Sequence, residues 1–236
     1  MQNKNKRAFA PELVSRLMDA ERFAVSLPPK EVFLAIDPNG GGESDFALVS
    51  CYFDRGTMVI CGFESIDSKG PDDHNPILKL HVLNLQGRFP NATIVFIIEN
   101  NLGFEAKHIQ HFCKTHLTGK ILHMSEKDCA GSVGFHTDHK LKQLMFAKFN
   151  EWLSRDAIRF DEKLLSLNTQ KGTQKVLEEL TEQLHSYSVI TELPKTQFGK
   201  IRKTYSGKVS AGAKGSLSAS LVFCYPSTRV CLCLYR

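Results

Sequence analysis

The run from Ala92 to Ile98 is apolar almost throughout and then ends at a carboxylate, Glu99. A strand with one solvated face alternates apolar and polar residues, whereas a continuous apolar run is typical of a strand buried on both faces. Such a strand needs helices packed above and below it. This one segment therefore favours a helix-covered sheet of the α/β class over an all-β or an all-helical fold.

The remaining apolar patterns extend this interpretation into an element order. Strand patterns are predicted at residues 32–36, 46–53, 57–64 and 120–126, and helical spacing at residues 11–25, 73–85, 104–116, 136–156 and 172–187. Arg55-Gly56 is a hairpin signal between the second and third strands. The order predicts an antiparallel three-strand meander, extended by parallel crossover strands and flanked by helices.

Within two of these helices the spacing also predicts which residues face the core. For residues 73–85 they are Ile77, Leu80, His81 and Leu85; for residues 136–156 they are Leu141, Leu144, Phe146, Phe149 and Leu153. Trp152 is interpreted as a core residue as well.

Composition excludes some functions and permits others. No apolar run is long enough for a transmembrane helix, and no secretory signal is found, so we expect an intracellular protein without a membrane partner. The seven cysteines include no CxxC pair, which favours reduced thiols over a zinc site. A GxxxxGK[ST] motif is absent, so no nucleotide-binding site is expected in this chain.

Two acids, Asp37 and Glu99, each end an apolar strand. If the two strands are parallel neighbours, their carboxyl ends bring both acids to one edge of the sheet. Two adjacent carboxylates repel unless a cation neutralises them, and hard oxygen ligands suit Mg²⁺ or Mn²⁺. Two ions about 3.5–4 Å apart would stabilise the attacking and leaving oxygens of a phosphoryl displacement.

Other interpretations of these residues stay open. Asp37 begins a good turn sequence, Asp-Pro-Asn-Gly, and an acid there can cap the turn instead of binding a metal. The glycines Gly40 to Gly42 either let a phosphate backbone approach closely or form a flexible hairpin. His136 and His139 are alternative metal ligands, but no third nitrogen or sulfur ligand is spaced with them.

A basic stretch from Lys195 to Lys214 contains several glycines and no acids, and it is predicted to be an exposed loop. The chain has a net charge of +5, which permits a polyanionic partner without requiring one.

Three segments together resemble a known family. They are IDPNGGGESDFALVS, IVFIIENN and GFHTDHKLKQLMFAKF, and in this order they look like the nuclease domain of viral terminase large subunits, found in herpesviruses and tailed phages. That family has a ribonuclease H-like fold. The resemblance implies three parts: an N-terminal linker with a helix (residues 1–30), a ribonuclease H-like nuclease domain (31–223) and an atypical C-terminal tail (224–236).

The resemblance also implies a function and a set of site residues. Asp37 and Glu99 would be catalytic metal ligands of an endonuclease that cuts concatemeric double-stranded viral DNA, with two Mg²⁺ or Mn²⁺ ions. Thr137 and Lys140 would lie beside the cut strand, and Lys203, Lys208 and Lys214 would contact DNA. Other terminase subunits and the capsid portal would be partners, in the host cell nucleus.

The sequence departs from the family at its last catalytic acid. KGSLSASLVFCYP stands in the matching place, and no acid follows Glu192. Either a third ligand comes from elsewhere, with Asp45 and Asp138 as candidates, or the domain has lost cleavage and serves as a DNA-binding or packaging-complex interaction module. A junction resolvase of the same superfamily is a third hypothesis.

Overall fold

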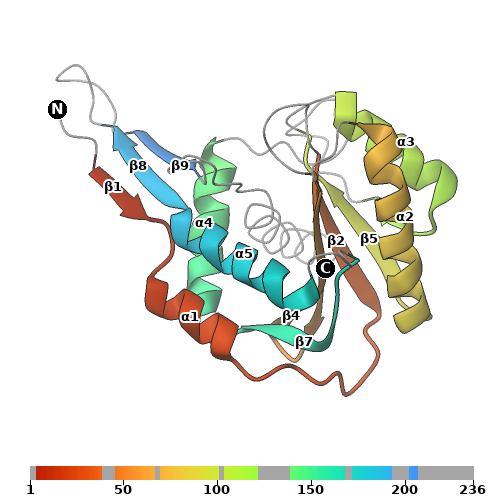
Figure 1. The fold of residues 1–236 in the computed structure, drawn as a ribbon, viewed down its shortest axis with the longest axis horizontal. Helices are drawn as coiled ribbons and strands as arrows, with labels where there is room; N and C mark the ends of the chain where they lie inside the picture. Colours follow the sequence, from red (N-terminus) through yellow and green to blue (C-terminus); the bar gives the residue numbers. More distant parts are fainter. Residues whose placement is uncertain are drawn as a thin grey trace.

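The fold is built around one large mixed sheet, with a smaller sheet at its side (Figure 1). The computed structural model describes residues 4–38, 46–66, 70–100, 104–121, 139–167, 172–192 and 202–206. Within these ranges, the large sheet has six strands in the order β6-β5-β2-β3-β4-β7, and the small sheet has the order β1-β8-β9.

The centre of the large sheet follows the predicted order. Strands β2 (Glu31–Asp37), β3 (Phe46–Asp54) and β4 (Thr57–Ile66) form an antiparallel meander. Strand β5 (Thr93–Ile98) pairs in parallel with β2, and β6 (Lys120–Ile121) pairs in parallel with β5. The prediction of a meander extended by parallel strands and flanked by helices is confirmed.

Strand β7 (Ile158–Leu165) was not predicted and extends the other edge of the sheet, parallel to β4. Its sequence is IRFDEKLL, in which charged residues interrupt the apolar pattern. One of those charges, Asp161, is fully buried, so the strand does not show the alternation that would have identified it.

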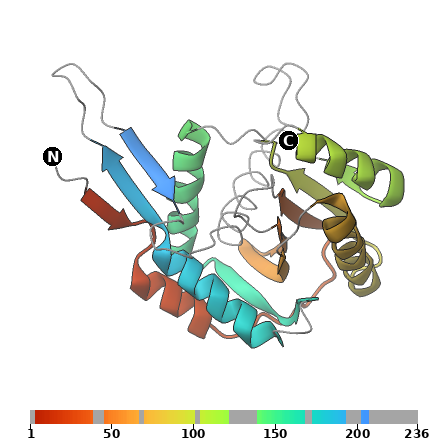
Figure 2. The same cartoon turned by 45° about the horizontal axis from the view of Figure 1, so that its top comes forward.

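Helices cover both faces of the sheet (Figures 1 and 2). On one face lie α2 (Pro71–Arg88) and α3 (Phe104–His116). On the other face lie α1 (Pro11–Asp19), α4 (His139–Ser154) and α5 (Gly172–Ser186). Among the described helices, none combines the length and the apolar character needed to cross a membrane.

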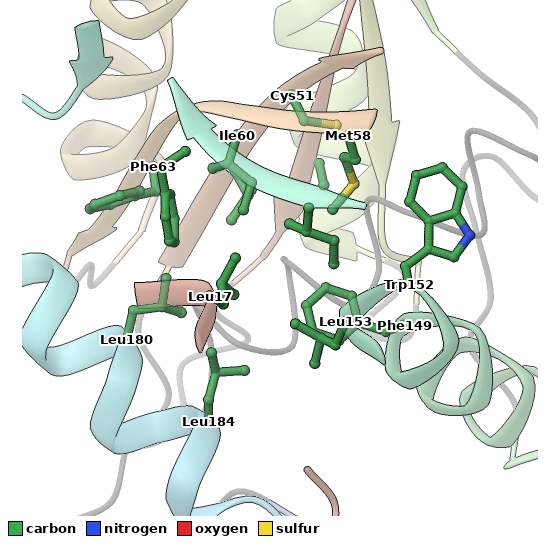
Figure 3. Close-up of a cluster of buried hydrophobic side chains, with 14 of the residues drawn as sticks. Leu17, Cys51, Met58, Ile60, Phe63, Phe149, Trp152, Leu153, Leu180 and Leu184 are labelled. Atoms are coloured by element: carbon green, nitrogen blue, oxygen red, sulfur yellow. The ribbon is translucent and has the colours of Figure 1, made fainter. Parts of the chain in front are cut away.

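Alternate strand residues supply two apolar cores, one under each helix layer. Phe33 and Ala35 join the core beneath α1, α4 and α5, while Leu34 and Ile36 join the core beneath α2 and α3. Figure 3 shows the first of these cores, where Leu17, Trp152 and Leu184 from three helices converge on the sheet. Trp152 is buried, which confirms its interpretation as a core residue.

Two of the residues predicted to face the core do not do so. Leu80 on α2 is 47% exposed and Leu144 on α4 is 48% exposed. Both helices bury a narrower stripe than the sequence pattern indicated, because each packs on the sheet along one line instead of being surrounded. The N-terminal helix is shorter than its pattern too: α1 ends at Asp19, and Phe23 forms a bridge with Asp161 of β7.

The small sheet corrects the prediction of an exposed loop from Lys195 to Lys214. Residues 202–206 form strand β9 (Arg202–Ser206), which pairs antiparallel with β8 (Ser188–Glu192). Thr204 and Tyr205 are good strand formers, and β8 offers them a partner edge that the local sequence does not reveal. The rest of the predicted loop lies outside the described residues.

The other edge of β8 pairs with β1 (Lys4–Arg7), so the first residues of the chain belong to this sheet. Phe9, Val14 and Leu17 are buried in the same core as α4 and α5. The N-terminal 30 residues thus contribute to the packed structure. The predicted domain boundaries at residues 30 and 223 stay predictions.

A buried ion pair ties α2 to β7. The carboxylate of Asp161, which has no exposed surface, accepts hydrogen bonds from the guanidinium of Arg88, from the Tyr52 hydroxyl at 2.8 Å and from the Lys163 backbone N–H at 2.7 Å. Arg88 also donates to the Lys163 carbonyl. Burial and the Asp161 carboxylate raise the pKa of Tyr52. Three partners thus compensate the cost of burying this carboxylate.

Candidate metal and active site

The register of two parallel strands brings Asp37 and Glu99 side by side. Ile36 of β2 is the register partner of Ile98 of β5, and each acid is the next residue in its strand direction. The Glu99 backbone N–H donates to the Ile36 carbonyl at 3.0 Å, which continues the ladder one step beyond Ile98. The prediction that both acids meet at one sheet edge is confirmed, while their role in catalysis stays a prediction.

Both acids point to the same side of the sheet. Side chains alternate along a strand, so Asp37 shares a face with Ala35, and Glu99 shares a face with Ile97. Ala35 and Ile97 belong to the core beneath α4 and α5. The acid pair therefore lies at the rim of that core, held by two fully buried strand ends.

The two carboxylates are under electrostatic strain. Burial raises the pKa of Asp37 well above its ordinary value, and so do the charge of Glu99 and a hydrogen bond between the two acids. The charge of Lys142 on α4 acts in the opposite direction. Such a pair shares a proton or attracts a cation.

A tyrosine forms the neighbouring wall. Tyr187 lies between α5 and β8, and its ring packs on Phe146 of α4 (centroids 4.9 Å apart) and on Phe9 (6.2 Å). Burial, followed by the charges of Asp37 and Glu99, raises the pKa of Tyr187. The phenol is therefore neutral at physiological pH and within electrostatic range of both acids.

Sequence reasoning missed Lys142 and Tyr187. The pattern around Lys142 shows a helix start with lysines at positions 140 and 142, but it does not reveal which of them is near the acids. Lys140, the predicted residue, is exposed in the first turn of α4. Tyr187 stands at the end of the helix predicted over residues 172–187, and nothing in the sequence linked it to the acids; α5 ends at Ser186.

Other predicted site residues can be placed only in part. Lys203 lies in strand β9. The following predicted residues lie outside the described part of the chain: Gly40, Gly41, Gly42, Asp45, His136, Thr137, Asp138, Lys208 and Lys214. His139 begins α4.

The donor set fits a hard divalent cation, although it is incomplete. Mg²⁺ and Mn²⁺ prefer oxygen ligands, and two adjacent carboxylates supply them. In the described ranges, no group of three or more His, Cys, Asp or Glu side chains could hold a metal ion.

Replacing Asp37 by asparagine is expected to stabilise the metal-free fold. The folded-state pKa of Asp37 is raised, so near pH 7 the folded state bears the cost of a carboxylate beside Glu99 that the unfolded state does not. We expect Asp37→Asn to raise the free energy of unfolding by about 1 kcal/mol in EDTA, within the range of single stabilising substitutions.

The gain should shrink as the pH falls and vanish below the ordinary aspartate pKa, where the wild-type carboxyl is protonated in both states. Urea unfolding at neutral and acidic pH measures both effects. A variant less stable than the wild type at neutral pH would contradict the repulsion between the two acids.

A meander extended by parallel strands, with one acid after the first strand and one after the fourth, is the arrangement expected of a ribonuclease H-like fold. Solved structures with a similar fold include terminase nuclease domains and large terminases. Compared by sequence, the chain matches neither a protein-family model nor a curated protein.

Three of these solved structures are representative. The human cytomegalovirus terminase nuclease domain, Mn soaked and inhibitor bound, aligns with a TM-score of 0.64 and 13% identity over 95% of each chain. The nuclease domain of the large terminase subunit gp2 of bacterial virus Sf6 gives a TM-score of 0.56 and 12% identity, over 93% of this chain and 98% of that one. The HK97 bacteriophage large terminase gives 0.56 and 10% identity, over 94% of this chain and 43% of that one.

Proposed function

We propose that the protein is a metal-dependent endonuclease that cuts double-stranded DNA during viral genome packaging. One observation supports this proposal above the others: the register of β2 and β5 places Asp37 and Glu99 together at the edge of a terminase-nuclease fold. The raised pKa of Asp37 adds to it, since a repelling carboxylate pair at a strand edge is costly unless it serves a function.

Asp37 and Glu99 would hold the divalent cations, two Mg²⁺ or Mn²⁺ ions, together with a third ligand for which Asp45 and Asp138 are the candidates. A bound ion supplies Lewis-acid stabilisation of phosphate oxygens and lowers the pKa of a bound water. The chain's own residues fix the two carboxylates on buried strands. Lys142 contributes positive charge beside Asp37, where a DNA phosphate would lie.

The partners follow from this function and are part of the proposal. They are concatemeric viral DNA, the other terminase subunits and the capsid portal, in the host cell nucleus. Lys140, Lys203, Lys208 and Lys214 would contact DNA phosphates without reading the sequence.

A second function is favoured by the missing last acid. No acid follows Glu192, and the stretch that matches the family's final catalytic motif has Ala219 and Ser220 in its place. A domain of this fold without cleavage would bind DNA or packaging proteins. It would still bind DNA after Asp37→Ala, and it would show no metal-dependent cleavage.

Metal binding can be tested apart from activity. A ligand that binds only the folded state stabilises it by mass action, by about 2.7 kcal/mol at a hundred times its dissociation constant. We expect Mn²⁺ to raise the melting temperature of the wild type and of the control Glu21→Gln, which changes an exposed acid between α1 and β2. Glu99→Ala should lose the Mn²⁺ effect.

Equal Mn²⁺ stabilisation of Glu99→Ala and wild type would rule out the acid pair as the metal site. Stabilisation of the wild type without plasmid cleavage would favour the cleavage-defective function.

A further inference from the structure

Helix α2 carries an apolar stripe on the side that faces away from the sheet. Leu80 is 47% exposed and Leu83 is 51% exposed, and Pro76 and Gly87 on the same side of the helix are exposed as well. Isolated exposed leucines are ordinary on a protein surface. These four residues instead follow one another along the helix as far as its last turn. We call this surface the α2 stripe: Pro76, Leu80, Leu83 and Gly87.

The spacing of the α2 stripe is that of a helix which packs on another helix. Its residues follow at intervals of four, three and four, the alternation of the apolar positions in a heptad. The opposite side of α2 packs on the sheet through Leu78, Val82 and Leu85. A helix that is apolar on opposite sides normally packs between two layers. In the described part of the chain, α2 has such a layer only on its sheet side.

A second copy of the chain would cover the stripe with matching shapes. If a two-fold axis passes between Leu80 and Leu83, the two helices run antiparallel and Leu80 lies against Leu83 of the partner subunit. Pro76 then lies against Gly87 of the partner subunit. A Cβ added at Gly87 would meet no atom within 4 Å, so there is open space for the proline ring.

The charges of α2 favour the antiparallel orientation over the parallel one. Asp72 and Asp73 are exposed in the first turn, and Lys79 borders the stripe. Parallel helices would place each of these charges beside its own copy, and like charges at such distances repel. Antiparallel helices separate the two acidic ends by about 25 Å, at 1.5 Å of rise per residue. They also place Lys79 beside the uncharged Gln86 of the partner subunit.

We propose that the α2 stripe is a self-association surface, through which two copies of the chain form a two-fold symmetric dimer with antiparallel α2 helices. Helix α2 covers the face of the large sheet opposite to the core whose rim carries Asp37 and Glu99 (Figure 1). The dimer therefore does not depend on the proposed nuclease function. A single helix pair is a small interface, so we expect a weak dimer, with a dissociation constant on the order of 10–100 μM.

The test is sedimentation equilibrium of the purified chain, over protein concentrations from about 1 to about 300 μM. Leu80→Glu/Leu83→Glu is compared with Leu27→Glu/Leu144→Glu, which makes the same replacements at two exposed leucines outside the stripe. We expect the stripe variant to associate at least about 10-fold more weakly than the wild type, because the glutamates of the two copies would meet. The control variant should associate like the wild type, and melting temperatures verify that both fold.

Cross-linking tests the orientation without removing the leucines. A mixture of the Pro76→Cys and Gly87→Cys variants, treated with a short bis-maleimide, should give a cross-linked dimer. Either variant alone should not exceed the wild-type background, since antiparallel helices hold like positions about 16 Å apart along the axis.

A wild type that stays monomeric at the highest concentration overturns the proposal and leaves the stripe to a different protein partner. Equal association of the stripe variant and the control overturns it as well, and so does cross-linking of each single-cysteine variant with itself in place of the mixture. Plasmid cleavage with Mn²⁺ is measured separately, and its absence would contradict the nuclease function while leaving the dimer in place.

Discussion

Glu99→Gln is expected to reduce Mn²⁺-dependent plasmid cleavage at least about 1000-fold, which corresponds to about 4 kcal/mol of transition-state stabilisation. The substitution keeps the shape of the side chain and removes its charge. The Glu99 backbone N–H donates to the Ile36 carbonyl, and the substitution leaves this bond intact, so the variant should fold normally. The loss of cleavage should then reflect the missing metal ligand. Asp37→Asn should lose activity to a similar extent.

Two measurements make this result specific. Glu21→Gln removes an exposed acid between α1 and β2 and should cleave like the wild type. Duplex binding in EDTA should be retained by Glu99→Gln, since loss of a carboxylate does not weaken attraction for phosphates. Cleavage by Glu99→Gln within tenfold of the wild type would remove Glu99 from the catalytic site.

Arg88→Met is expected to lower the free energy of unfolding by about 3–5 kcal/mol, the cost of leaving a buried carboxylate without its charged partner. Asp161 has no exposed surface, and Arg88 supplies its only cationic partner in the described part of the chain. Methionine keeps much of the arginine's apolar stem, so the loss should report the ion pair. Urea unfolding measures the change.

A double-mutant cycle separates this effect from lost packing. Arg88→Met combined with Asp161→Asn should recover much of the stability, because asparagine removes the charge, its Oδ1 can still accept from the Lys163 N–H, and its Nδ2 can donate to the Tyr52 hydroxyl. Tyr52→Phe alone should cost about 1–2 kcal/mol. If Arg88→Met and the double variant are equally unstable, the contribution of Arg88 is packing.

The acid pair was predictable because both strands are apolar up to the acid. A strand buried on both faces lies near the centre of the sheet, so β2 and β5 had to be near neighbours. The crossover between them makes the two strands parallel, so their carboxyl ends lie at the same side of the sheet. Once Asp37 and Glu99 end such strands, their proximity follows from topology alone.

The missed features have tertiary causes. β7 contains the buried charge of Asp161, which only the distant Arg88 makes tolerable. β9 forms because β8 offers an edge, and β8 itself is flanked by the N-terminal strand; no local pattern encodes pairing between residues near 5, 190 and 204. The exposure of Leu80 likewise depends on which elements pack against α2, and the periodicity of the sequence does not show which these are.

The bond from Ala8 to Tyr187 has a practical consequence for anyone shortening this protein. Trimming the chain to begin at Glu31, where the sequence pattern starts the domain, would remove β1, the Phe9 ring and the N–H that holds the Tyr187 carbonyl. The edge of β8 would lose its partner strand, and the aromatic wall next to the acids would lose one of its two supporting rings. Such a truncated protein could fail to cleave DNA with every predicted catalytic residue intact, so assays of activity need the first ten residues in place.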